Sequence, residues 1–89
     1  MKVVILYRPK SEYSRAVETF AHDYQTRHGS KQFELINADE REGLALASLY
    51  GIMSFPAIIA MSSDGRLLHM WEGARLPLID EVASYMYTV

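Results

Sequence analysis

Two serines three positions apart, Ser11 and Ser14, are the residues of this chain best placed to carry chemistry. They lie between an apolar run and a helical pattern, where a loop leads into a helix. A serine nucleophile needs a positioned base and a site for the oxyanion, and no nearby His–Asp spacing supplies them. A serine hydroxyl can also accept hydrogen bonds from the free N–H groups at a helix start. We therefore expect at least one of the two serines to cap the helix, and we do not expect a hydrolase.

The composition restricts the other classes of function. The 89 residues contain no cysteine, so this chain has no disulfide and no cysteine-ligated metal. The net charge is −2 with acids and bases interspersed, which predicts no nucleic-acid partner and no membrane partner. His22, His28 and His69 lack the spacing of a helical ligand pair, so we expect no metal site and no cofactor.

No apolar stretch is long enough to cross a bilayer, and the apolar run at the N-terminus is too short for a signal peptide. We therefore expect one soluble domain over residues 1–89, located in the cytoplasm. A monomer is expected rather than a homo-oligomer.

Hydrophobic patterns predict the elements that hold the two serines in place. Apolar runs at 3–6 and 57–61, a shorter one at 33–36, and a segment at 66–71 after the turn signal Ser63-Asp64-Gly65 are typical of strands. Helical stripes are formed by Val17, Phe20, Ala21 and Tyr24, by Leu46, Leu49 and Tyr50, and by Ile79, Val82, Ala83 and Met86. The order strand, helix, strand, helix, strand, strand, helix predicts an α/β fold. Its mixed four-stranded sheet should carry helices on both faces, with the first and third strands at the centre.

The ends of these helices also have local signals. Gly29 and Gly51 are expected to end the first two helices. Asp39 with Glu42 resembles a capping box for the second helix, and Pro77 suits the first turn of the third. On the fourth strand Met70 and Trp71 alternate, so we expect one to face inward and the other outward, with a structural role for Trp71.

The second half of the chain resembles thioredoxin. Residues 50–57, YGIMSFPA, are similar to the thioredoxin segment Tyr-Gly-Ile-x-x-x-Pro-Thr, whose proline is cis. Gly65 matches the hairpin glycine of that family, and the pair Gly73-Ala74 matches the Gly-Ala before the last helix. The resemblance implies the thioredoxin-like fold and a cis bond at Pro56.

The resemblance also places the two serines. Their separation from Pro56 is about that between the first redox cysteine and the cis-proline, so Ser11 and Ser14 replace both cysteines of Cys-x-x-Cys. Tyr13 between them is similar to the tyrosine of glutaredoxin's Cys-Pro-Tyr-Cys, and the chain has the smaller glutaredoxin size. Ile5 and Leu35 stand where thioredoxin has a buried aspartate and its lysine partner, which argues against a thioredoxin proper.

The family implies a binding site beside this proline. In it, the residue before the cis-proline, here Phe55, offers its backbone to an extended polypeptide or to glutathione. By position, Tyr13, Met53, Gly73 and Ala74 would surround that site with Pro56. Arg8 and Lys10 could meet a glutathione carboxylate, although a solvated basic loop is the simpler interpretation.

Three functions stay open. The leading hypothesis is a redox-inactive binding domain, since a hydroxyl cannot replace the thiolate that disulfide exchange requires. The second is a thiol–disulfide oxidoreductase whose two cysteines are replaced by serine in this polypeptide. The third is a purely structural subunit or homodimer, which would use the apolar groove or an exposed sheet edge.

Overall fold

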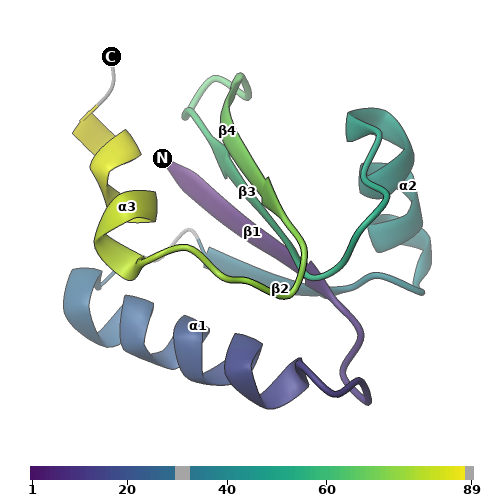
Figure 1. Ribbon diagram of the computed structural model, residues 1–89. Helices are drawn as coiled ribbons and strands as arrows, with labels where there is room; N and C mark the ends of the chain where they lie inside the picture. Colours follow the sequence, from purple (N-terminus) through teal and green to yellow (C-terminus); the bar gives the residue numbers. More distant parts are fainter. Residues whose placement is uncertain (30–32, 88–89) are drawn as a thin grey trace.

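The computed structural model describes residues 1–29 and 33–87 and has the predicted order of elements (Figure 1). The strands are β1 (Lys2–Tyr7), β2 (Phe33–Asn37), β3 (Ala57–Met61) and β4 (Leu67–Glu72). The helices are α1 (Ser14–His28), α2 (Arg41–Tyr50), α3 (Ile79–Ala83) and the 3₁₀ helix η1 (Ser84–Tyr87). The sheet order β2-β1-β3-β4 confirms that the first and third strands are central.

The sheet is mixed. β1 pairs in parallel with β2, with Val3 opposite Phe33, as expected for strands joined by a crossover helix. β1 also pairs antiparallel with β3, and β3 pairs antiparallel with β4 across the hairpin. Because both central strands have neighbours on each side and covered faces, their apolar runs are almost completely buried.

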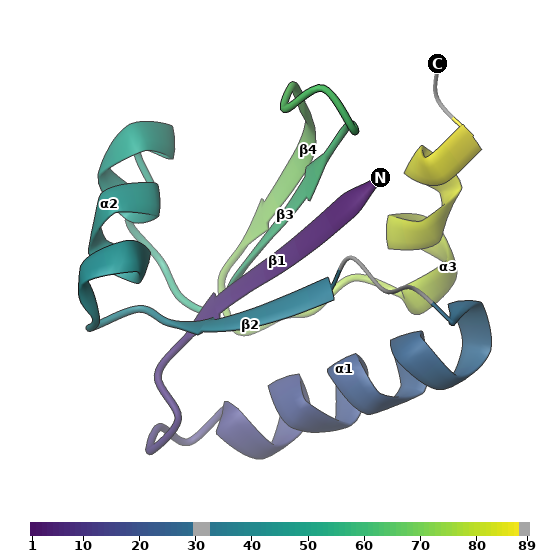
Figure 2. The same ribbon diagram turned by 180° about the vertical axis from the view of Figure 1, so that it is seen from behind.

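Helices cover both faces of the sheet, and two separate cores result. Figure 2 shows α1 and α3 on one face and α2 on the other. The first core joins alternate β1 residues to both α1 and α3; it comprises Val3, Ile5, Tyr7, Val17, Phe20, Ala21, Tyr24, Phe33, Ile58, Val82 and Ala83. The second comprises Val4, Leu6, Ile36, Ile52, Ala57 and Ile59, with Leu46, Ala47 and Tyr50 of α2 packed against it. The predicted stripes of α1 and of α3 up to Ala83 are therefore core residues, whereas Leu49 of the α2 stripe is exposed.

The helix ends at glycine are confirmed. Gly29 follows α1 with φ of 57°, and Gly51 follows α2 with φ of 65°. This left-handed conformation is strained for residues with a Cβ atom, which is why glycine ends both helices.

The predicted helix starts are wrong. α1 begins at Ser14 after Tyr13, and neither serine caps it through its side chain. The N-cap position is taken by Tyr13, so Ser11 lies two residues too early and Ser14 one residue too late to cap the helix. The Ser11 hydroxyl donates to the Arg8 carbonyl at 2.6 Å. α2 follows Glu40 with no side-chain cap, because the carboxylate of Asp39 pairs with Arg8 rather than with a backbone N–H group.

The C-terminal part also departs from the prediction. α3 begins at Ile79, so Pro77 lies two residues before it rather than in its first turn. β4 runs from Leu67 to Glu72, one residue later than predicted. Met70 and Trp71 do lie on opposite faces, but both are partly buried, since each face of the sheet carries a core. The side chain of Met86 lies outside the described residues.

Candidate functional site

The segment before β3 positions the candidate site. The Phe55–Pro56 peptide bond is cis. The N–H of Gly73 donates to the Pro56 carbonyl at 2.9 Å, which joins the end of β4 to the start of β3. The structure therefore brings together Phe55, Pro56 and Gly73, three of the residues predicted for the site.

The backbone of Phe55 is free to pair with a ligand. Within the part of the chain that the structure describes, neither its N–H nor its C=O makes a hydrogen bond. Its side chain is partly buried against the core under α2, which holds the residue in place. An unpaired N–H and C=O beside the end of a sheet are the groups that an extended peptide would use.

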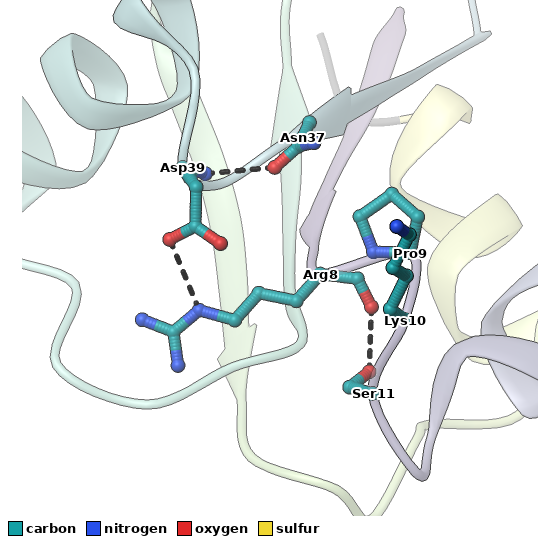
Figure 3. Close-up of a pocket in the computed structure, with 6 residues that line it drawn as sticks. All are labelled: Arg8, Pro9, Lys10, Ser11, Asn37 and Asp39. Carbon is teal, nitrogen blue, oxygen red and sulfur yellow. Dashed lines mark hydrogen bonds and ion pairs between the residues drawn. The ribbon is translucent and has the colours of Figure 1, made fainter.

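Arg8 connects this segment to the loops after β1 and β2. Its guanidinium carbon lies 5.2 Å from the centre of the Phe55 ring, within the range of a cation–π contact. Its Nε donates to Oδ1 of Asp39 at 3.2 Å (Figure 3). Arg8 therefore contacts both Phe55 and Asp39, and 54% of its side chain is exposed.

Beside Arg8 lies an open pocket of about 320 Å³, lined by Arg8, Pro9, Lys10, Ser11, Asn37 and Asp39 (Figure 3). Oδ1 of the Asn37 side chain accepts the Asp39 N–H at 2.8 Å, which leaves the side-chain NH₂ of Asn37 as a donor. Arg8 and Lys10 add positive charge, which the carboxylate of Asp39 offsets in part.

Asn37 and Asp39 were not predicted as site residues. Asn37 is the last residue of the edge strand β2, and Asp39 follows it. Because β2 runs parallel to β1, the loop after β2 and the Arg8–Ser11 loop leave the same end of the sheet. Ligands of α/β sheets often bind beside the carboxyl ends of parallel strands, and this rule could have identified both residues.

Ser11 and Ser14 lie on one turn at the start of α1. The Ser14 N–H donates to the Ser11 carbonyl at 3.3 Å, and Ser11 also lines the pocket beside Arg8. A turn closed by this bond holds the Cα atoms of its first and last residues within about 7 Å. The two serines are thus neighbours at the helix start.

The remaining predicted residues lie in different surroundings. Met53 is 86% exposed, two residues before Phe55. Ala74 is exposed and follows Gly73 directly. Tyr13 packs against the core under α1 and α3, and its hydroxyl is buried without a partner among the described residues. Phe55 packs on the other core, so the structure gives Tyr13 a packing role.

Tyr7 is the titratable group closest in sequence to Arg8 whose pKa is shifted. Burial, and then the charge of Glu18, raise the pKa of the Tyr7 hydroxyl, which donates to Glu18 Oε2 at 3.3 Å. Tyr7 therefore remains a neutral donor at physiological pH.

Among the described residues, no helix is long and apolar enough to span a membrane.

Three solved thioredoxins have this arrangement of elements. Thioredoxin 1 of Thermosipho africanus is 15% identical with a TM-score of 0.70, over 97% of this chain and 90% of that one. Deadhead of Drosophila melanogaster is 20% identical with a TM-score of 0.71, over 94% and 75% of the two chains. Mitochondrial thioredoxin 3 of Saccharomyces cerevisiae is 14% identical with a TM-score of 0.71, over 98% and 76%.

These similarities establish the thioredoxin-like fold, a four-stranded mixed sheet with helices on both faces. No protein-family model matches the sequence, and a comparison with curated proteins found no match.

Proposed function

We propose that this chain is a redox-inactive thioredoxin-like domain that binds an extended polypeptide or a thiol ligand such as glutathione beside Phe55 and Pro56. The observation that carries the proposal is the unpaired backbone of Phe55, whose side chain packs against the core under α2. Redox inactivity follows from chemistry, because Ser11 and Ser14 offer hydroxyls where disulfide exchange needs a thiolate.

The free energy needed for binding favours a ligand that contacts both the backbone of Phe55 and the neighbouring pocket. Two backbone hydrogen bonds contribute only about 1–3 kcal/mol in total. A dissociation constant of about 100 μM requires about 5.5 kcal/mol, so further contacts must supply the rest. Arg8, Lys10 and the amide of Asn37 offer donors to a carboxylate on such a ligand.

A free carboxylate distinguishes glutathione from an internal polypeptide segment as the ligand. Asp39 accepts a hydrogen bond from Nε of Arg8, so the terminal guanidinium nitrogens of Arg8 stay available to a ligand. Glutathione carries free carboxylates, whereas an internal polypeptide segment carries none. A peptide held only by backbone pairing should therefore be insensitive to Arg8, and glutathione should depend on it.

The test is a chemical-shift titration of isotope-labelled protein with three probes. The probes are S-methylglutathione, a valine-rich pentapeptide blocked at both ends, and the same peptide with a free C-terminal carboxylate. We expect at least one probe to shift the amides of Phe55 and Gly73. Unchanged Phe55 and Gly73 amides at millimolar concentrations of all three probes would contradict the proposal.

Arg8→Ala separates the two classes of ligand. It should weaken the probes with a free carboxylate about fivefold, since one exposed charge-assisted hydrogen bond contributes about 1 kcal/mol. It should leave the blocked peptide unchanged. Arg66→Ala is the matched control, because Arg66 makes a similar exposed pair with Asp64 at 3.3 Å in the β3–β4 hairpin. An equal effect of both variants would show that only net charge matters.

A second candidate is an oxidoreductase in which serines replace both cysteines. The turn from Ser11 to Ser14 favours it, because its Cα separation is compatible with a disulfide. The double variant S11C/S14C tests this candidate. Turnover of a disulfide substrate, with a thiol pKa at position 11 well below 8.5, would support the oxidoreductase. A disulfide that forms without turnover would favour the binding domain.

A further inference from the structure

Beyond its first turn, which carries the exposed Arg41 and Glu42, the outer face of α2 lacks the charges that solvent-facing helices usually carry. The exposed positions of α1 are polar or charged except for Ala16. Beyond the first turn of α2, the exposed positions are Leu44, Ala45, Ser48 and Leu49. The solvent-facing side of a helix normally carries polar or charged residues, so two exposed leucines on one side are unusual. The outer face of α1 therefore suits contact with water, whereas the outer face of α2 suits contact with another apolar surface.

This surface is extensive and uncharged. Leu44 is 58% exposed, Leu49 is 71% exposed, and Met53 after the helix is 86% exposed. Residues 43–63 contain no charged side chain, although 22% of the whole chain is charged. In Figure 1, α2 lies at one side of the molecule with its outer face free of other elements.

The four residues of this face are arranged with approximate two-fold symmetry. Residues 44–49 read LALASL, and about their midpoint Leu44 mirrors Leu49 while Ala45 mirrors Ser48. At 100° per residue, their order around the helix is Leu44, Ser48, Ala45, Leu49. Two small side chains thus lie between two leucines. A second helix could approach the small side chains closely, and its own side chains could interdigitate with the leucines on both sides.

We propose that this face of α2 joins two copies of the chain, with the two α2 helices antiparallel across a two-fold axis. Leu44 of each copy then packs beside Leu49 of the other, and Ala45 beside Ser48. The inference is independent of any ligand beside Phe55. It replaces the expectation of a monomer, because the fold leaves Leu44 and Leu49 exposed on this face.

The approximate symmetry of this patch and its lack of charge indicate that a second copy of the chain covers it. A two-fold interface uses the same patch on both chains, so a patch with net charge would face its own charge. This patch has none, and about its midpoint leucine mirrors leucine (Leu44 and Leu49) and one small residue mirrors another (Ala45 and Ser48). Arg41 and Glu42, in the first turn, fall at the rim, where charged residues of interfaces usually lie.

The expected dimer is weak. A contact between single helices of ten residues is at the small end of specific interfaces. The dimer should therefore form with a dissociation constant on the order of 10–100 μM, and it should respond to dilution.

Sedimentation at a series of concentrations tests the proposal. The wild-type mass should rise from one chain toward two. Leu49→Glu should weaken the dimer at least about tenfold, because it places two carboxylates in the contact. Leu78→Glu is the matched control, since Leu78 is an equally exposed leucine (75%) before α3, and it should dimerise like the wild type. A wild type that stays monomeric at 1 mM, or a Leu49→Glu dimer of unchanged strength, would overturn the proposal.

Disulfide cross-linking tests the antiparallel register, because the chain has no cysteine of its own. The variants Ala45→Cys and Ser48→Cys are prepared separately and oxidised alone and as a mixture. The mixture should yield the mixed disulfide faster than either variant yields its own. Equal rates for all three pairs would contradict the antiparallel arrangement.

Discussion

Gly43 tests how α2 is seated against the chain that leads into it. It is the one buried residue of α2 within the described structure. A Cβ atom at this position would lie 2.9 Å from the Asn37 carbonyl carbon and from the Ala38 Cα, and closer still to the Asn37 oxygen. These are backbone atoms, so Gly43→Ala can be accommodated only if α2 moves away from the end of β2.

Two effects of opposite sign determine the size of the change. Replacing glycine by alanine inside a helix stabilises it by about 1 kcal/mol. Overpacking costs about 1–3 kcal/mol, and contact with backbone places this case at the upper end. The net loss should be about 2 kcal/mol, which lowers the melting temperature by about 8–16 °C in a domain of this size.

Urea and thermal unfolding of dilute protein measure this loss. Ser48→Ala is the control on the same helix, where the exposed side chain gains helix propensity without a clash, about 0.5 kcal/mol in the stabilising direction. Gly43→Ala should also shift the amide signals of Asn37 and Asp39. A Gly43→Ala variant as stable as the wild type would refute the inferred contact between α2 and Asn37.

Two further predictions concern buried and half-buried side chains. Tyr24→Phe should stabilise the protein by about 1 kcal/mol at neutral pH, because the buried Tyr24 hydroxyl has no partner among the described residues. Burial also raises the pKa of Tyr24 above 10.0, so wild-type stability should be full below pH 10 and fall as the pH rises through the raised pKa; Tyr24→Phe should reduce this loss in alkaline urea titrations. Glu81→Ala should cost about 1 kcal/mol and change the fluorescence of the single tryptophan, because Trp71 Nε1 donates to Glu81 at 3.0 Å. Glu12→Ala, at an exposed turn residue, should change neither property.

The sequence by itself was sufficient for the order of the elements. The apolar runs at 3–6 and 57–61 identified the two central strands, since only strands covered on both faces are continuously apolar. Gly29 and Gly51 identified two helix ends, because the left-handed conformation needed there favours glycine regardless of the surroundings. These features depend on burial periodicity and on local backbone preference, both of which are encoded in neighbouring residues.

Only the tertiary structure determined which hydrogen-bond or ion-pair partner each polar group has. Asp39 has the local pattern of a helix cap, but Arg8, 31 residues earlier, takes its carboxylate. Asn37 lies in the pocket because two parallel strands end side by side. The apolar pattern of α2 was visible in the sequence, but which of its leucines meets solvent depended on how the helix sits on the sheet. Several partners are chemically acceptable for such groups, and the choice among them depends on distances that arise when remote segments pack together.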